Sequence, residues 1–184
     1  MSTLVLNNTK KLSFKIQAFA ALAATVCAVA VPQIFHLMGA VSGLGTALGE
    51  TFLPMHLPII LVGLLAGPYA GALAGALGPV ISFLLSGMPT ALMLPFMVAE
   101  LCAYGLLAGL LREVRMPTFF KVLAVQIGGR AVRAIAILAA VYGFGSAAPV
   151  ASIWKSILTG IIGLALQWAL LPLVVYRVEH ADKR

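Results

Sequence analysis

Six long apolar segments divide the sequence, and most of its charged residues lie between them or at the ends. The segments cover approximately residues 13–37, 54–67, 69–86, 91–111, 118–142 and 150–176. About 20 apolar residues in an α-helix cross the hydrocarbon core of a bilayer, because each residue adds about 1.5 Å. Only 9% of the chain is charged, against about 25% in soluble domains, so a surface facing water is excluded. We therefore expect an all-α integral membrane protein in which residues 1–184 form a single bundle of six transmembrane helices.

Outside the interiors of the predicted spans, lysine and arginine occur on only one side of the predicted membrane. The basic residues before the first segment, between the fourth and fifth, and after the sixth are Lys10, Lys11, Lys15, Arg112, Arg115, Lys121, Arg177, Lys183 and Arg184. The loops after the first, third and fifth segments contain no lysine or arginine. Because basic loops stay in the cytoplasm, we expect both termini to be cytoplasmic. This distribution accounts for most of the net charge of +7 without any nucleic-acid partner.

Several ionisable residues remain inside the predicted spans. Glu100, Arg130, Arg133 and Lys155 lie within apolar segments, and His56 begins the second segment on the outer side. A charge at the centre of a bilayer costs about 2.5 to 3.5 kcal/mol, so each charge needs a partner or a water-filled cavity. One carboxylate cannot neutralise two arginines and a lysine. We therefore predict a polar cavity open to the outside, whose surplus positive charge binds an anion through the planar guanidinium groups.

Simpler roles stay open for the same residues. Glu100 could only tie two helices together through an arginine, Lys155 could extend to the outer surface, and His56 could be an ordinary helix-start residue. Cys27 and Cys102 lie in apolar runs and form no metal or disulfide pattern, so we expect no metal and no cofactor.

Small residues recur at four-residue spacing along two parts of the chain. The first segment carries Ala20, Ala24 and Ala28, and glycines recur in the same way from Gly63 to Gly75. Such strips allow helix backbones to approach closely. We expect the glycines to pack inside the bundle, whereas the alanines could also receive another subunit.

The stretch from Met55 to Leu111 resembles the substrate-binding S component of energy-coupling factor (ECF) vitamin transporters. The similarity lies in "MHLPIILVGLLAGPYAGALAGALGPVISFLLSGMPT" and in "MVAELCAYGLLAGLL", with the Gly-Pro step and the "SGMP" loop as its clearest marks. The resemblance implies a bacterial or archaeal cytoplasmic membrane protein that binds a micronutrient in the outer half of the bundle. It also implies loops that close over the site, here with Gly45 and Glu50 in one and Gly87, Met88 and Pro89 in the other.

The same resemblance implies partners. S components dock on a transmembrane T component that carries two ABC ATPases, through an alanine motif that Ala20, Ala24 and Ala28 match. ATP hydrolysis is then expected in the partners, and this chain contains no GxxxxGK[ST] phosphate-binding motif. The chain itself is expected not to be an enzyme.

The cargo is not named by any motif. A carboxylate-bearing vitamin or precursor such as pantothenate, niacin or lipoate fits the charge surplus, but so does a phosphate, or an aromatic heterocycle held by Trp154 or Tyr104. Two other functions stay open: an intramembrane enzyme that uses Glu100 and His56 as acid and base, and a small secondary transporter that works alone. An inverted repeat, which would favour the transporter, is not visible in the sequence.

Overall fold

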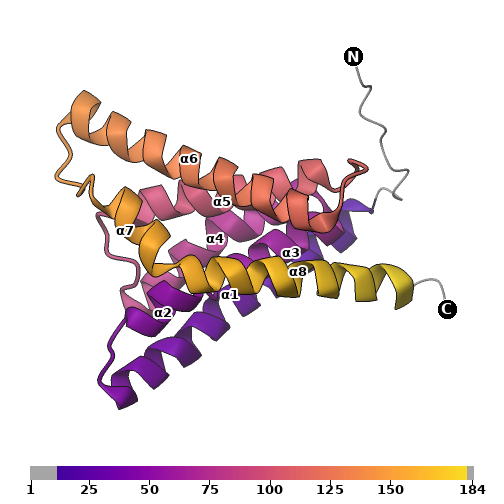
Figure 1. Ribbon diagram of the computed structural model, residues 1–184, viewed down its shortest axis with the longest axis horizontal. Helices are drawn as coiled ribbons and strands as arrows, with labels where there is room; N and C mark the ends of the chain where they lie inside the picture. Colours follow the sequence, from indigo (N-terminus) through magenta and orange to yellow (C-terminus); the bar gives the residue numbers. More distant parts are fainter. Residues whose placement is uncertain (1–11, 182–184) are drawn as a thin grey trace.

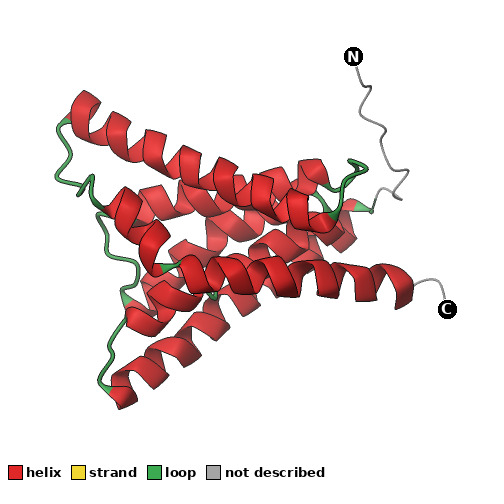
Figure 2. Ribbon diagram, viewed as in Figure 1, coloured by secondary structure: helices red, strands yellow, loops and turns green. Residues whose placement is uncertain are grey.

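Every regular element in residues 12–181, the part of the chain that the computed structural model describes, is an α-helix. The elements are α1 (Phe14–Ser42), α2 (Ala47–Phe52), α3 (His56–Ala66), α4 (Pro68–Ser86), α5 (Leu94–Leu111), α6 (Thr118–Phe144), α7 (Ser152–Thr159) and α8 (Ile161–Ala181). They form one bundle of long helices with two short ones at one end (Figures 1 and 2). Lys10, Lys11, Lys183 and Arg184, which support the predicted orientation, lie outside the described residues.

Six helical stretches of the described chain are long and apolar enough to cross a membrane. They are α1, the pair α2–α3 taken together, α4, α5, α6 and the first part of α8. The predicted all-helical class and the predicted number of spans are therefore confirmed.

Two segments differ from the prediction. Residues 38–53, between the first two predicted segments and including Gly45 and Glu50, were expected to form a loop. Instead, α1 continues to Ser42, where Gly43 ends it with φ of 74°, and the same stretch contains α2. The sixth segment was expected to be one helix from residue 150 to 176, but it is divided at Gly160 into α7 and α8. A Cβ at Gly160 would lie 2.7 Å from Leu53 Cδ1, so the missing side chain lets this corner pack against the end of α2.

The tightest packing in the bundle joins α3, α4 and α5 through glycines. A Cβ at Gly63 would lie 2.6 Å from the Gly105 carbonyl oxygen, and one at Gly71 would overlap the backbone of Gly105. Gly75 lies equally close to the backbone of Leu101. The predicted internal role of the glycine strip is therefore confirmed, because any side chain at these positions would separate the helices.

The alanines of α1 face the inside of the bundle. Ala24 and Ala28 are buried and Ala20 is half-buried. A Cβ at Gly78 of α4 would make ordinary contact, 3.4 Å, with the Ala28 Cβ. The alanines that match the docking motif therefore contribute mainly to the contact between α1 and its neighbours in the same chain.

A buried polar network connects α8 and α6 to the turn between α2 and α3. Gln126 Nε2 donates to Gln167 Oε1 at 3.0 Å, Trp168 Nε1 donates to Gln126 Oε1, and Gln167 Nε2 donates to the Leu53 carbonyl at 3.4 Å. Buried amides need such partners, because lipid offers none. The network fixes Leu53, which has a positive φ of 48°, at the start of the α3 region.

The two ends of the bundle differ. The short helices α2 and α7 and the connections α1–α2, α4–α5 and α6–α7 gather at one end (Figure 1). The start of α1, the turn between α5 and α6 and the end of α8 lie toward the other end (Figure 1). His56 at the start of α3 and Lys155 on α7 belong to the first of these ends.

Candidate functional site

A cavity of about 560 Å³ opens at the end of the bundle that carries α2 and α7. This volume is typical of small-molecule sites. Its polar lining residues come from α1, α2, α3, α4, α6, α7 and the connections between them, and are His36, Thr46, Glu50, His56, Ser82, Thr90, Arg130, Arg133, Ser152, Lys155, Ser156 and Thr159. Its remaining lining is mainly methionine and proline.

Two arginines of α6 share one carboxylate beneath the cavity. Arg133 Nη1 donates to Glu100 Oε2 at 2.9 Å, and Arg130 Nε lies 3.3 Å from Glu100 Oε1. Glu100 is fully buried, while the arginine side chains are 11% and 16% exposed. Residues 130 and 133 lie on one face of the helix, one turn apart, so α6 presents both to α5.

The Glu100 carboxylate has a further partner on its own helix. The Tyr104 hydroxyl donates to Glu100 Oε1 at 3.0 Å, and the Tyr104 ring lies 5.3 Å from the His56 ring, measured between centroids. Tyr104 is itself fully buried. Glu100 therefore binds three donor side chains, those of Arg130, Arg133 and Tyr104, and Tyr104 packs beneath the site.

Several buried polar atoms around the cavity have no hydrogen-bond partner within the described chain. They are Nη2 of Arg130, Nε of Arg133, both ring nitrogens of His56, and Oγ of Ser152. Unsatisfied buried donors of this kind are costly, so they indicate a binding partner from outside the chain. All four residues line the cavity.

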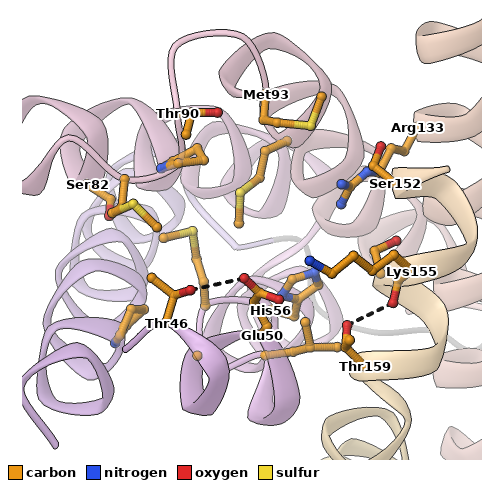
Figure 3. Close-up of a pocket in the computed structure, with 18 of the residues that line it drawn as sticks. Thr46, Glu50, His56, Ser82, Thr90, Met93, Arg133, Ser152, Lys155 and Thr159 are labelled. Atoms are coloured by element: carbon orange, nitrogen blue, oxygen red, sulfur yellow. Dashed lines mark hydrogen bonds between the residues drawn. The ribbon is translucent and has the colours of Figure 1, made fainter. Parts of the chain in front are cut away.

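The short helix α7 adds a cation and two hydroxyls to the same wall. Arg130 Nη1 donates to Ser156 Oγ at 2.8 Å, which ties α6 to α7. Lys155 is exposed, and Figure 3 shows its side chain extending into the cavity toward Glu50. Glu50 accepts a hydrogen bond from Thr46 Oγ1 at 3.1 Å.

The connection between α4 and α5 forms part of the opposite wall. Met88 and Pro89 line the cavity, together with Thr90 and Met93 (Figure 3). Gly87 ends α4 with φ of 69° and does not line the cavity. Gly45, in the connection between α1 and α2, has φ of 57° and does not line it either.

The sequence model of the family described as "ECF transporter, substrate-specific component" matches residues 18–175. The chain belongs to this family. No curated protein and no solved structure matches the chain significantly. The ECF substrate-specific component is a substrate-binding subunit of a transporter and works with T and ATPase components. The family is one of transport subunits rather than of enzymes.

In this ECF component, most of the predicted ionisable residues meet at one cavity. Arg130, Arg133, Lys155 and His56 line it, and Glu100 lies directly beneath, in contact with both arginines. Both oxygens of Glu100 are occupied by donors, an arrangement that does not favour the alternative in which this carboxylate works as a free acid or base.

Two predicted aromatic contacts of the ECF component lie away from the cavity. Trp154 is 69% exposed and lies on α7 beside Lys155, but it does not line the cavity, because neighbouring residues of a helix project about 100° apart. Tyr104 is enclosed under Glu100. An aromatic ring system held by either residue is therefore not supported by their positions.

Sequence reasoning missed several lining residues of the ECF component. Ser152, Ser156 and Thr159 accompany Lys155 on α7, and their spacing of four and three residues was a helical signal for one polar face. Three further methionines, Met55, Met93 and Met97, line the cavity together with the predicted Met88. The clustering of Met93 and Met97 near Met88 was visible, but an apolar side chain in an apolar segment gives no sign of which surface it faces.

Proposed function

We propose that this chain is the high-affinity binding subunit of an ECF importer for a small anionic vitamin or related micronutrient. The substrate occupies the cavity between α2, α6 and α7, and is delivered through a T component that two ABC ATPases drive. The observation that carries the proposal is the pair of arginines whose unpaired nitrogens border a cavity of about 560 Å³. A guanidinium group binds a carboxylate through two parallel hydrogen bonds, which supplies both affinity and orientation.

The proposed membrane orientation places the cavity outside and both termini in the cytoplasm. Its support is the distribution of basic residues along the sequence, together with the lining of the cavity by α2 and α7. These helices lie at the end of the bundle opposite the start of α1 and the end of α8 (Figure 1). A micronutrient would then reach the site from the external solution.

A thermal-shift screen of the purified, detergent-solubilised protein against water-soluble vitamins and their precursors tests this function. A ligand at about 1,000 times its dissociation constant stabilises the folded state by about 4 kcal/mol. We expect one anionic compound to raise Tm, and Arg130→Ala and Arg133→Ala to remove this effect. Arg115→Ala, an exposed arginine beyond the end of α5, is the matched control and should leave the shift unchanged.

Transport measurements separate the proposal from a transporter that works alone. In liposomes, we expect the purified chain to bind the identified compound without accumulating it, and to support uptake only when the T component, both ATPases and ATP are present. Uptake by the chain alone would favour the secondary transporter. A protein that stays folded and responds to no vitamin or precursor would count against the proposed function.

A further inference from the structure

The wall of the cavity is divided into two chemically different sides. Arg133, Ser152 and Lys155 lie on the side formed by α6 and α7, whereas Thr90 and Met93 lie on the opposite side, near the junction of α4 and α5 (Figure 3). A ligand that fills the cavity therefore meets cationic groups at one end and an uncharged wall at the other. This division restricts the shape and polarity of the ligand as well as its charge.

The charges around the cavity limit the charge of the ligand. Three cations, Arg130, Arg133 and Lys155, accompany two carboxylates, Glu100 beneath the cavity and Glu50 at its edge. Counted without the two histidines, these groups give the site one net positive charge. A single carboxylate balances this charge, whereas a phosphate monoester or a dicarboxylate leaves an excess negative charge in a partly desolvated site, which is unfavourable.

Flexible thioethers make up much of the uncharged lining of the cavity. Met55, Met88, Met93 and Met97 are four of the seven methionines of the chain. Among the described residues that line the cavity, none is phenylalanine, tyrosine or tryptophan. Methionine adapts its shape to apolar and aromatic groups, and its sulfur makes favourable contacts with ring edges. The wall therefore fits a largely apolar body but provides no aromatic platform on which a large ring system would stack.

His56 adds one polar contact to the floor of the cavity. Its ring is 3% exposed, lines the cavity, and makes no hydrogen bond through either nitrogen within the described chain. Figure 3 shows it beneath the Lys155 amino group and beside Glu50. The body of the ligand thus needs one uncharged hydrogen-bonding group within reach of this ring, because an apolar group there would leave both nitrogens unsatisfied.

We infer that the substrate is a monocarboxylate with a compact, uncharged body that has an apolar side and at least one hydrogen-bonding group, and that it binds with its carboxylate against Arg130 and Arg133. This inference rests on the proposed function and specifies its ligand. The carboxylate completes the hydrogen bonds of the arginines and of Ser152, and the body lies against the methionines. Primary amides and phosphate monoesters of the same body fit the cavity in size but not in charge.

Matched compounds test the inference on the full-length protein in detergent. Nicotinate and pantothenate are each compared by thermal shift and by calorimetry with nicotinamide and pantothenol, and pantothenate also with phosphopantothenate. Lipoate, compared with lipoamide, is the acid whose body lacks a nitrogen or oxygen hydrogen-bonding group. We expect one of the acids to bind about 10- to 100-fold more tightly than its uncharged partner, since a hydrogen bond to a charged group contributes about 1.5 to 3 kcal/mol. We also expect the phosphate ester to bind more weakly than its acid.

Two variants test separately the contacts of the carboxylate and the contacts of the body of the ligand. Ser152→Ala, which does not disturb the ion pairs of Glu100, should reduce the preference for acid over uncharged partner. Met93→Ala should weaken acid and uncharged partner by the same factor and so leave the preference intact. Met116→Ala, in the turn before α6 and away from the cavity, is the control and should change neither affinity.

The inference and the proposed function fail in different ways. Equal binding of an acid and its uncharged partner, or tighter binding of a phosphate ester or of another dianion, would overturn the inference, yet the chain would remain a binding subunit. Binding of none of the acids, together with binding of a neutral or cationic vitamin, would overturn the inference and also the anionic cargo in the proposed function, and would leave only the role of binding subunit. If no vitamin binds at all, both fail together.

Discussion

At the scale of single residues, the main structural role at the site belongs to Glu100, which separates and aligns two arginines that would otherwise repel each other. We expect Glu100→Gln to lower Tm of the ligand-free protein strongly, because removing one member of a buried charge group costs on the order of 3 to 5 kcal/mol. Tyr104→Phe removes only one hydrogen bond to the same carboxylate, and should cost about 1 kcal/mol. Thermal unfolding in detergent measures both.

A double substitution provides the control for Glu100. In Glu100→Gln/Arg133→Gln, one uncompensated cation is removed with the carboxylate, so this protein should be more stable than the single Glu100→Gln variant. If the double variant is the less stable of the two, the loss in Glu100→Gln arises from packing, and the carboxylate is not the counter-charge that we describe.

The same residues show how far a sequence carries the description of a site. Arg130, Arg133, Lys155 and His56 were predictable because a charge or an imidazole in a span must avoid lipid, and this requirement alone directs it toward a cavity. Trp154 was not predictable, since an aromatic side chain is acceptable to lipid and to a binding site alike. The contact of Tyr104 with Glu100 follows from their spacing of four residues, but its enclosure below the site depends on the neighbouring helices.

At the scale of elements, α1 has two faces lined by small residues. Ala24 and Ala28 are buried inside the bundle, whereas Ala23, Cys27 and Ala30 are exposed. If α1 docks on the T component, the face with the exposed small residues allows a partner helix to approach more closely than larger side chains would. We expect Ala23→Leu to reduce co-purification with the T component while the ligand-induced thermal shift stays normal, and Ala28→Leu to lower Tm instead.

A substitution on a different helix controls for size alone. Ala169→Leu enlarges an exposed alanine of α8 and should affect neither assembly nor Tm. Loss of assembly in Ala28→Leu with an unchanged Tm would show that the inward alanines form the docking surface after all. Hydropathy predicted that the α1 segment spans the membrane. It did not predict which face of α1 lies inside the bundle, because a helix in lipid is apolar all round.

At the scale of the whole molecule, the basic residues outside the spans and the cavity mark opposite ends. In a chain with Cys27→Ala and Cys102→Ala, we expect a membrane-impermeant maleimide to label Ala147→Cys, in the connection between α6 and α7, in intact cells. Arg115→Cys, in the turn between α5 and α6, should react only after permeabilisation. Both positions are exposed, so access depends on the side of the membrane. The reverse pattern would place the cavity in the cytoplasm.

The sequence did not predict where the helices are interrupted. Six spans follow from counting apolar residues. The division at Gly160 and the short helix α2 instead depend on contacts between distant segments, such as that of Gly160 with Leu53, and no local pattern encodes these contacts.

The unequal burial of the helices has a mechanical consequence. No residue of α2 or of α7 is buried, although both border the cavity, whereas α4 and α5 touch backbone to backbone at Gly71 and Gly105. One side of the site thus behaves as a stiff frame that fixes where a ligand must sit. The other is a more compliant mouth, held by the packing of Gly160 on Leu53 and by the hydrogen bond from Arg130 to Ser156. Passage of a solute into the cavity can then deform the mouth alone and leave the frame, with Glu100 on it, undisturbed.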